Sequence, residues 1–195
     1  MSNNRFKVGV AGAGVMGSGI TQVMALAGCE VSCCDIDDEV INVALTNVDN
    51  GRFGVKSAAD RGMISEEEGE SALKRMHFTT EMDALNDADL VIEAIPERLD
   101  LKVSFWKELD KRALEKTIFA SNSSGFPISA MAAATERADR FIGWHWASPA
   151  PVMKLAEIVR GKETSEETVD TVVSLAKSAG KNPIVINDND SNWGY

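Results

Sequence analysis

Histidine is the residue type that most readily exchanges protons near neutral pH, and this sequence holds only two, His77 and His145. His145 comes near the end of a predicted strand from Arg140 to Trp146, and ligands bind at the carboxyl edge of an open sheet. Glu157 follows twelve residues later on the next predicted strand, and the proline-containing connection could bring its carboxylate against the imidazole. Such a carboxylate would fix the tautomer and stabilise the imidazolium, so the pair could act as a general base and its partner.

The residues alone also allow a structural role for this histidine. Phe141, Gly143 and His145 alternate along the strand and could share one face, which would make His145 a hydrogen-bonded core residue. His77 has no carboxylate context of this kind and begins a strand after a helical segment, so we interpret it as structural. Both interpretations of His145 stay open at this point.

Three glycines near the N-terminus supply a second chemical signature. Gly12, Gly14 and Gly17 have the spacing G-x-G-x-x-G between a predicted strand, Phe6 to Val10, and a predicted helix, Val15 to Ala27. The first would allow a tight turn, the second would let a pyrophosphate approach the backbone, and the third would let helix and strand pack closely. Phosphates would then lie at the helix N-terminus. The context predicts a dinucleotide site rather than a turn without a ligand; its expected contacts are Gly12, Gly14, Val15, Met16 and Gly17.

Asp35 is expected at the end of the second strand, predicted from Glu30 to Ile36. A carboxylate at this place accepts hydrogen bonds from the adenosine ribose hydroxyls and repels a 2′-phosphate. The residues that follow, Ile36 to Glu39, include no arginine that could hold such a phosphate. The sequence therefore favours NAD over NADP as the cofactor.

The composition limits what else the protein could bind. The chain has 195 residues, 44% of them apolar, and a net charge of −10, which argues against a nucleic-acid partner or an anionic membrane surface. Its apolar runs are too short to span a bilayer, and its N-terminus lacks the pattern of a signal peptide, so we expect a cytoplasmic protein. Cys29, Cys33 and Cys34 lack metal-site spacing, and reduced core thiols with no bound metal are expected.

Strands and helices alternate along the chain, which predicts an α/β fold with a doubly wound, mostly parallel sheet of the Rossmann type. Residues 37–76, after the second strand, are expected to form an inserted hairpin of two helices, Asp37 to Arg61 and Ser65 to Arg75. Ser65 and Glu68 fit a capping box at the second of these. Later segments are predicted as the strands Ala88 to Ile95, Thr117 to Ser121, Met153 to Val159 and Pro183 to Asn187, and as the helices Leu99 to Leu114 and Ser165 to Ala179.

Three segments together resemble the L-3-hydroxyacyl-CoA dehydrogenase family, and the match covers essentially the whole chain. They read G-A-G-V-M-G-S-G-I at residues 12–20, S-N-S-S at 121–124 and H-W-A-S-P-A-P-V-M-K-L-A-E-I-V at 145–159. The last is the specific one, because its M-K-L-x-E-I-V ending at that distance from the histidine distinguishes this family from other dinucleotide-binding domains. The resemblance implies NAD as cofactor and interconversion of 3-hydroxyacyl-CoA and 3-oxoacyl-CoA.

The resemblance also implies roles for individual residues. His145 would take the hydroxyl proton at substrate C3, Glu157 would orient it, and Ser124 would hydrogen-bond the reacting oxygen. Glu97 and Lys102 match residues near the nicotinamide half of the cofactor, although charges at this spacing also suit a solvated helix face.

The same resemblance suggests how the substrate is held and where this chain differs. The helical insertion would clasp the coenzyme A tail, with Arg61 at a basic position there. Ser148 stands where the family has the asparagine of H-F-F-N-P, so a shorter hydroxyl replaces an amide that contacts nicotinamide or substrate. Gly125, followed by Phe126, stands where a second serine is usual. The catalytic pair is kept while its surroundings change, which indicates an unusual substrate or a slower enzyme.

The resemblance finally bears on domain organisation. Residues 1–187 are expected to form the NAD-binding domain, and residues 188–195 to begin a linker. Relatives continue there through D-x-P-G-F into a helical second domain, which supplies their dimer interface and the far wall of the acyl pocket. We expect this domain to be missing from the sequence, and the parent enzyme to be a homodimer through it.

These observations predict the NAD-binding part of an L-3-hydroxyacyl-CoA dehydrogenase, weakly active or inactive by itself. One alternative is a dehydrogenase of a small hydroxy acid or carnitine-like substrate, against which the M-K-L-x-E-I-V segment and the long insertion weigh. The other is a non-catalytic NAD(H)-binding module, against which His145 and Glu157 weigh, because neither is needed to bind NAD.

Overall fold

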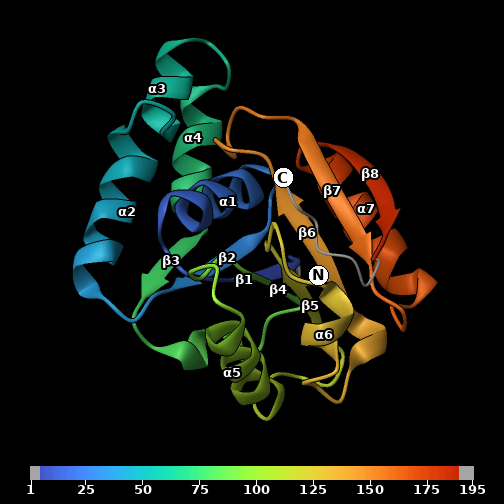
Figure 1. Ribbon diagram of the computed structural model, residues 1–195. Helices are drawn as coiled ribbons and strands as arrows, with labels where there is room; N and C mark the ends of the chain where they lie inside the picture. The colour runs from blue at the N-terminus through green and yellow to red at the C-terminus, as the bar shows by residue number, and fades with distance from the viewer. Residues whose placement is uncertain (1–4, 189–195) are drawn as a thin grey trace.

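The computed structural model describes residues 5–188, and one sheet runs through the whole of this part of the chain (Figure 1). Its eight strands lie in the order β3-β2-β1-β4-β5-β6-β7-β8. Every neighbouring pair is parallel except β6 with β7, which is antiparallel, so the predicted mostly parallel sheet is confirmed. The strands are β1 (Lys7–Ala11), β2 (Glu30–Cys34), β3 (Met76–Thr79), β4 (Leu90–Glu93), β5 (Ile118–Ser121), β6 (Phe141–Trp146), β7 (Leu155–Arg160) and β8 (Asn182–Asn187).

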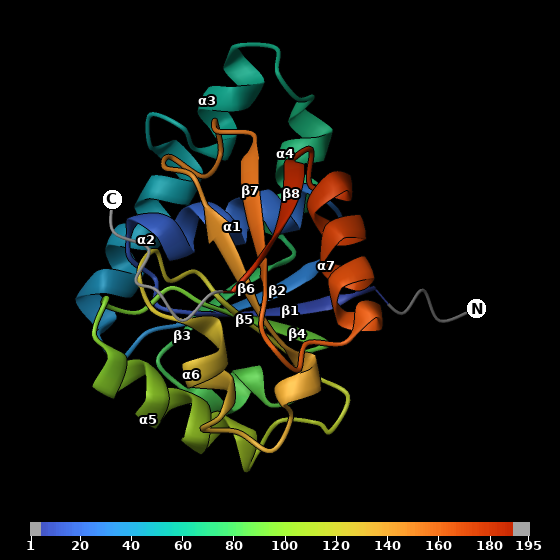
Figure 2. The same cartoon turned by 45° about the vertical axis from the view of Figure 1, so that its right-hand side comes forward.

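Helices cover both faces of the sheet, as a doubly wound fold requires (Figures 1 and 2). The core on one face contains buried residues of α1 (Val15–Leu26), α2 (Asp38–Asn50) and α7 (Glu166–Ser178). The core on the other face contains buried residues of α5 (Leu99–Asp110) and α6 (Ile128–Ala132). Because side chains alternate along a strand, β6 contributes to both cores.

The insertion after β2 is present but holds three helices rather than the predicted two. The single helix expected from Asp37 to Arg61 is wrong, because α2 ends at Asn50 and α3 spans Val55–Asp60. The break comes at Gly51, whose backbone is extended and where a Cβ would lie 2.3 Å from the carbonyl oxygen of Asn47. The third helix, α4 (Glu66–Leu73), begins with the expected capping box of Ser65 and Glu68. In both views α3 lies at the far end of the insertion (Figures 1 and 2).

Smaller differences lie at the ends of elements. The predicted strand Ala88 to Ile95 narrows to Leu90–Glu93, and the predicted helix Leu99 to Leu114 ends at Asp110. Helix α6 was not predicted, since a five-residue helix is too short to show a helical period. The expected linker at 188–195 lies beyond the described residues except for Asp188. Within residues 5–188, no helix is both long and apolar enough to cross a membrane.

Candidate active site

The sheet register brings His145 and Glu157 together. Strands β6 and β7 are antiparallel, and their pairing sets His145 directly opposite Glu157. Opposite residues on one face of an antiparallel pair lie close enough for their side chains to interact. His145 Nδ1 lies 2.6 Å from Glu157 Oε2, and both side chains are partly exposed, at 26% and 18%. The predicted approach of carboxylate to imidazole is therefore present.

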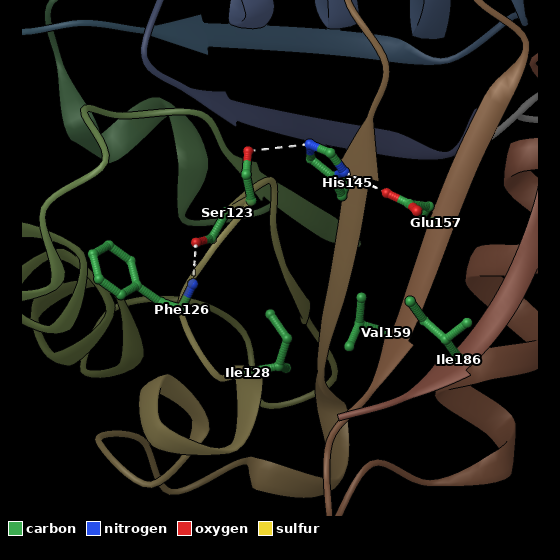
Figure 3. A pocket seen from close by; sticks show the side chains of 8 residues that line it. Ser123, Phe126, Ile128, His145, Glu157, Val159 and Ile186 are labelled. Carbon is green, nitrogen blue, oxygen red and sulfur yellow. Dashed lines mark hydrogen bonds and ion pairs between the residues drawn. The ribbon is translucent and has the colours of Figure 1, made fainter. Parts of the chain in front are cut away.

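The second ring nitrogen of His145 faces Ser124. This serine follows β5, which lies beside β6 in the sheet, and its Oγ is 3.1 Å from His145 Nε2. A neutral imidazole that donates from Nδ1 to a carboxylate has its lone pair on Nε2, where it can accept the serine hydroxyl. Figure 3 shows His145 between the carboxylate of Glu157 on one side and a serine hydroxyl on the other. The arrangement leaves a basic nitrogen at a solvent-accessible edge.

The alternation predicted along this strand is also present. Phe141 and Val159 belong to the core beneath α6, and a Cβ on Gly143 would meet Val159 and Ile128. His145 continues this face at the strand end, where the core gives way to a small hollow lined by Phe126, Ile128, Val159 and Ile186 (Figure 3). His77 lies exposed on β3, at the opposite edge of the sheet. Only one of the two histidines is therefore placed at this site.

Lys102 is buried rather than on a solvated helix face. Its side chain is 0% exposed, and its Nζ lies 2.5 Å from Glu93 Oε1, 3.2 Å from Glu97 Oε2 and 3.2 Å from the carbonyl oxygen of Ile95. Glu97 is 44% exposed and joins this ion pair to the turn that carries Ser124. Glu93 was missed by the sequence reasoning, although a carboxylate inside the apolar strand Ala88 to Ile95 was the signal that could have found it.

The pKa values of the two glutamates in this cluster, Glu93 and Glu97, shift in opposite directions. Burial raises the pKa of Glu93, against the opposing effects of Lys102, Ser121 and the backbone N–H of Ile95. Burial also acts to raise the pKa of Glu97, but the hydrogen bond from Ser123 and the charge of Lys102 outweigh it and lower the pKa. Glu97 is therefore held in its charged form beside the Ser124 turn.

The glycine turn has the shape that a dinucleotide needs. Gly12 has φ +93°, and a Cβ there would lie 2.7 Å from the carbonyl oxygen of Ala94. At Gly17 a Cβ would lie 1.7 Å from the carbonyl oxygen of Gly12, so only glycine allows the turn and helix to close. Gly14, at the start of α1, has nothing within 4 Å of that position, which leaves its backbone open to a phosphate. Of its two neighbours, Val15 is 75% exposed and Met16 is half-buried.

Asp35 lies one residue beyond β2 and supports this turn. Its Oδ2 accepts a hydrogen bond of 2.7 Å from the backbone N–H of Ala13. The carboxylate thus stands beside the glycine turn at the carboxyl edge of the sheet, where the adenosine ribose of a dinucleotide would lie. The open Gly14 backbone and this carboxylate fit NAD.

Two other expected contacts, Arg61 and Ser148, lie on connections outside the strands and helices. Arg61 follows α3, where its guanidinium donates to the carbonyl oxygens of Ser57 and Arg52 and to the hydroxyl of Ser57. Ser148 is exposed on the connection between β6 and β7. Sequence reasoning also missed Lys181, which is 6% exposed and donates to two carbonyl oxygens of that connection. Together, fold and glycine turn define a Rossmann-type, dinucleotide-binding domain.

Comparisons with known proteins narrow this class. Residues 7–189 match the family described as 3-hydroxyacyl-CoA dehydrogenase, NAD binding domain. A probable 3-hydroxybutyryl-CoA dehydrogenase of Bacillus subtilis is 41% identical over 179 residues, which cover 92% of this chain and 61% of that protein. The human mitochondrial hydroxyacyl-coenzyme A dehydrogenase is 37% identical over 93% of this chain and 59% of its own. The crystal structure of (S)-3-hydroxybutyryl-CoA dehydrogenase PaaH1 from Ralstonia eutropha has a TM-score of 0.91 and 38% identity, covering 98% of this chain and 66% of that one.

The chain belongs to the 3-hydroxyacyl-CoA dehydrogenase family and comprises its NAD-binding domain, as the sequence resemblance implied. Its cofactor is NAD. The chain spans only 61% and 59% of the lengths of the two curated relatives described above.

Proposed function

We propose that this protein interconverts L-3-hydroxyacyl-CoA and 3-oxoacyl-CoA. The observation that carries the proposal is the contact of His145 with both Ser124 and Glu157 at the sheet edge that also holds the glycine turn. NAD, when bound, accepts the hydride that leaves C3 of the substrate. Neither the serine nor the carboxylate is needed to bind a dinucleotide, so their presence favours a catalytic domain over a binding module.

Each of the three side chains has a distinct task in this proposal. His145 Nε2 takes the proton of the C3 hydroxyl, and in the reverse direction the imidazolium returns it. Glu157 holds the ring with Nδ1 toward its carboxylate and stabilises the imidazolium. Ser124 already hydrogen-bonds Nε2 and can transfer this bond to the C3 oxygen of the substrate. The proton thus leaves the C3 hydroxyl oxygen and the hydride leaves C3 itself, each toward a different acceptor.

Cofactor and substrate would be held by the parts around this centre. Gly12, Gly14, Val15, Met16, Gly17 and Asp35 hold the adenosine and phosphate half of NAD, and Glu97, Lys102 and Ser148 lie toward the nicotinamide half. The insertion holds the coenzyme A tail, with Arg61 as one cation for its phosphates.

The proposal extends to the whole protein. We place the helical domain that the resemblance implies beyond residue 187 and at the dimer interface of the parent enzyme. A cytoplasmic location is also part of the proposal, and the free thiols of Cys29, Cys33 and Cys34 support it.

A second substrate class is favoured by one observation, the Ser148 hydroxyl in place of an amide. A dehydrogenase of a small hydroxy acid or carnitine-like compound would use the same His145 and Glu157. It would need no contact with the insertion, so arginine and lysine substitutions there would leave its rate unchanged.

The test is the reduction of acetoacetyl-CoA by NADH in a full-length version of the enzyme. His145→Ala should lower turnover by roughly 10² to 10⁴, the usual contribution of a positioned general acid or base, with NADH affinity nearly unchanged. Glu157→Gln should also slow the reaction. His77→Ala is the matched control, because it removes the other histidine at the far edge of the sheet and should retain full turnover. Wild-type turnover in His145→Ala would remove the catalytic role and favour the binding module.

The NAD preference has its own test at Asp35. Asp35→Asn keeps an oxygen that can accept from the N–H of Ala13 but removes the charge that repels a 2′-phosphate. Asp35→Ala removes both. Fluorescence titration should show that the wild type binds NADH well and NADPH poorly. Asp35→Asn should reduce this difference in affinity, and Asp35→Ala should weaken NADH binding by about 1 to 3 kcal/mol. Equal affinity of the wild type for both cofactors would remove Asp35 from the ribose site.

A further inference from the structure

The Glu97 carboxylate is surrounded by donors from the turn that carries Ser124. Its Oε1 accepts hydrogen bonds from the backbone N–H of Ser124 at 3.0 Å and of Gly125 at 3.2 Å. The hydroxyl of Ser123 donates to the same oxygen. Its other oxygen, Oε2, pairs with Lys102 at 3.2 Å. Both carboxylate oxygens are therefore engaged within the protein.

The anchor behind this carboxylate is buried. The side chains of Lys102 and Glu93 are both 0% exposed, and Lys102 Nζ lies 2.5 Å from Glu93 Oε1. Glu93 Oε2 also accepts the hydroxyl of Ser121, at the end of β5, and that hydroxyl accepts the N–H of Ser123. One ion-paired cluster thus fixes the strand end and the turn beyond it.

The other hydrogen bonds of this turn hold the neighbours of Ser124: Asn122 Oδ1 accepts the N–H of Trp146, and Ser123 Oγ accepts the N–H of Phe126. Ser124 is exposed, and its contact with His145 is a single hydrogen bond of 3.1 Å. Without an acceptor below the turn, the N–H groups of residues 124 and 125 would be free to move toward water. Gly125, the next residue, adds backbone freedom at this point.

We infer that Glu97 is a positioning residue that fixes Ser124 against His145 by accepting the backbone N–H groups of the 124–125 turn. This inference rests on the proposed function for its catalytic consequence, but the geometry itself can be tested without catalysis. The resemblance places the same residue near the nicotinamide. A role in cofactor contact alone would leave the exchange of the Ser124 and Gly125 amides unchanged when Glu97 is replaced.

The deciding experiment is hydrogen exchange of the Ser124 and Gly125 amides, measured by NMR on the 195-residue chain. Glu97→Ala should raise the exchange rates of both amides about ten-fold or more, because each loses a charged acceptor. Glu97→Gln keeps one acceptor oxygen and should restore most of the protection. Asp100→Asn is the matched control, since it neutralises another carboxylate of the same segment, paired with Arg98 at the surface, and should leave both amides unchanged. Unchanged exchange in Glu97→Ala overturns the inference.

A second readout separates positioning from cofactor contact. At saturating NADH, Glu97→Ala should lower kcat for acetoacetyl-CoA in a full-length version of the enzyme about ten-fold, in addition to any loss of NADH affinity from the proposed nicotinamide contact. In the Ser124→Ala background the same substitution should cost nothing further, since the group to be positioned is gone. A ten-fold loss of NADH affinity with amide protection intact would assign Glu97 to the cofactor and overturn the inference. A full-length wild type without dehydrogenase activity removes the proposed function, and amide exchange in the 195-residue chain then decides the inference alone.

Discussion

Two loops that reach the carboxyl edge of the sheet are each held by a buried lysine, in contrasting ways. Lys102 meets two carboxylates, one of them fully buried. Lys181 instead donates to the carbonyl oxygens of Ala150 at 2.5 Å and Met153 at 2.8 Å, with its Nζ 5.3 Å from the ring centroid of Trp146. No carboxylate within residues 5–188 pairs with it. One loop is held by opposite charges, the other by a cation that meets carbonyl dipoles and an aromatic ring.

The contrast matters because each lysine supports different parts of the site. Lys102 lies behind Glu97 and the Ser124 turn. Lys181 anchors the connection between β6 and β7, which follows His145 and carries Ser148. That connection also packs on α1, since a Cβ on Gly19 would lie 3.1 Å from Pro151. Removing one lysine strands a buried charge, whereas removing the other strands only carbonyl groups, and the two should differ in energy.

The largest effect is expected at Lys102. Lys102→Met leaves the Glu93 carboxylate buried without a cation, which should lower the free energy of unfolding by about 3 to 5 kcal/mol. Urea denaturation followed by circular dichroism measures this loss.

The control removes both charges at once. Glu93→Gln combined with Lys102→Met leaves no buried ion and should recover most of the stability lost in the single variant. If the double variant is as unstable as Lys102→Met alone, the lysine stabilises the fold by packing and not by charge.

This ion pair also shows where prediction from the sequence stops. The glycine turn, the strand before it and Asp35 could be predicted because glycine spacing and apolar runs are local signals. His145 and Glu157 could be predicted as a pair because a short connection joins neighbouring strands. Burial of Lys102 could not, because it depends on which way α5 turns against β4, and the same spacing of charges suits an exposed helix.

The insertion and Lys181 illustrate two further limits. Gly51 ends α2 and Gly54 precedes α3, both through extended backbone geometry, while the apolar pattern around them suits a single longer helix. The partners of Lys181 are main-chain carbonyls 28 and 31 residues away in sequence, and carbonyls carry no sequence signal. Side-chain contacts with distant main-chain carbonyls therefore cannot be predicted from the sequence.

The effect at Lys181 should be smaller. Lys181→Met removes the donor to two carbonyls, which costs about 1 to 3 kcal/mol, but it also removes an unpaired buried charge. The free energy of unfolding should therefore fall less than in Lys102→Met, by the same urea measurement. If the two variants lose the same free energy of unfolding, the Glu93 carboxylate beside Lys102 does not make its removal more costly than that of Lys181.

The pH dependence of stability sharpens the same contrast. Burial lowers the pKa of Lys181 below the ordinary lysine value of about 10.4. Between the lowered pKa of the folded state and the ordinary pKa of the unfolded state, Lys181 of the unfolded chain still binds a proton that the folded chain has released. In this pH range the residue therefore makes the free energy of unfolding rise with pH. Below the folded pKa the full cost of burying the charge is present. Unfolding free energies measured at several alkaline pH values should show that the stability of the wild type increases relative to that of Lys181→Met as pH rises. A difference that stays constant would contradict the lowered pKa.

The smallest effect is expected at Ser148, on the loop that Lys181 holds. Ser148→Asn restores the amide that the family pattern has at this position, and one regained hydrogen bond should raise kcat/KM for acetoacetyl-CoA by up to about ten-fold. The gain depends on the connection being fixed, so it should shrink in the Lys181→Met background and persist in Glu97→Gln, which affects the other loop. A loss of activity on a small hydroxy acid, with no gain on acyl-CoA, would instead favour the second substrate class. If no acyl-CoA substrate responds to the substitution, position 148 does not contact the reacting groups, and the two loops differ in function as well as in the way they are held.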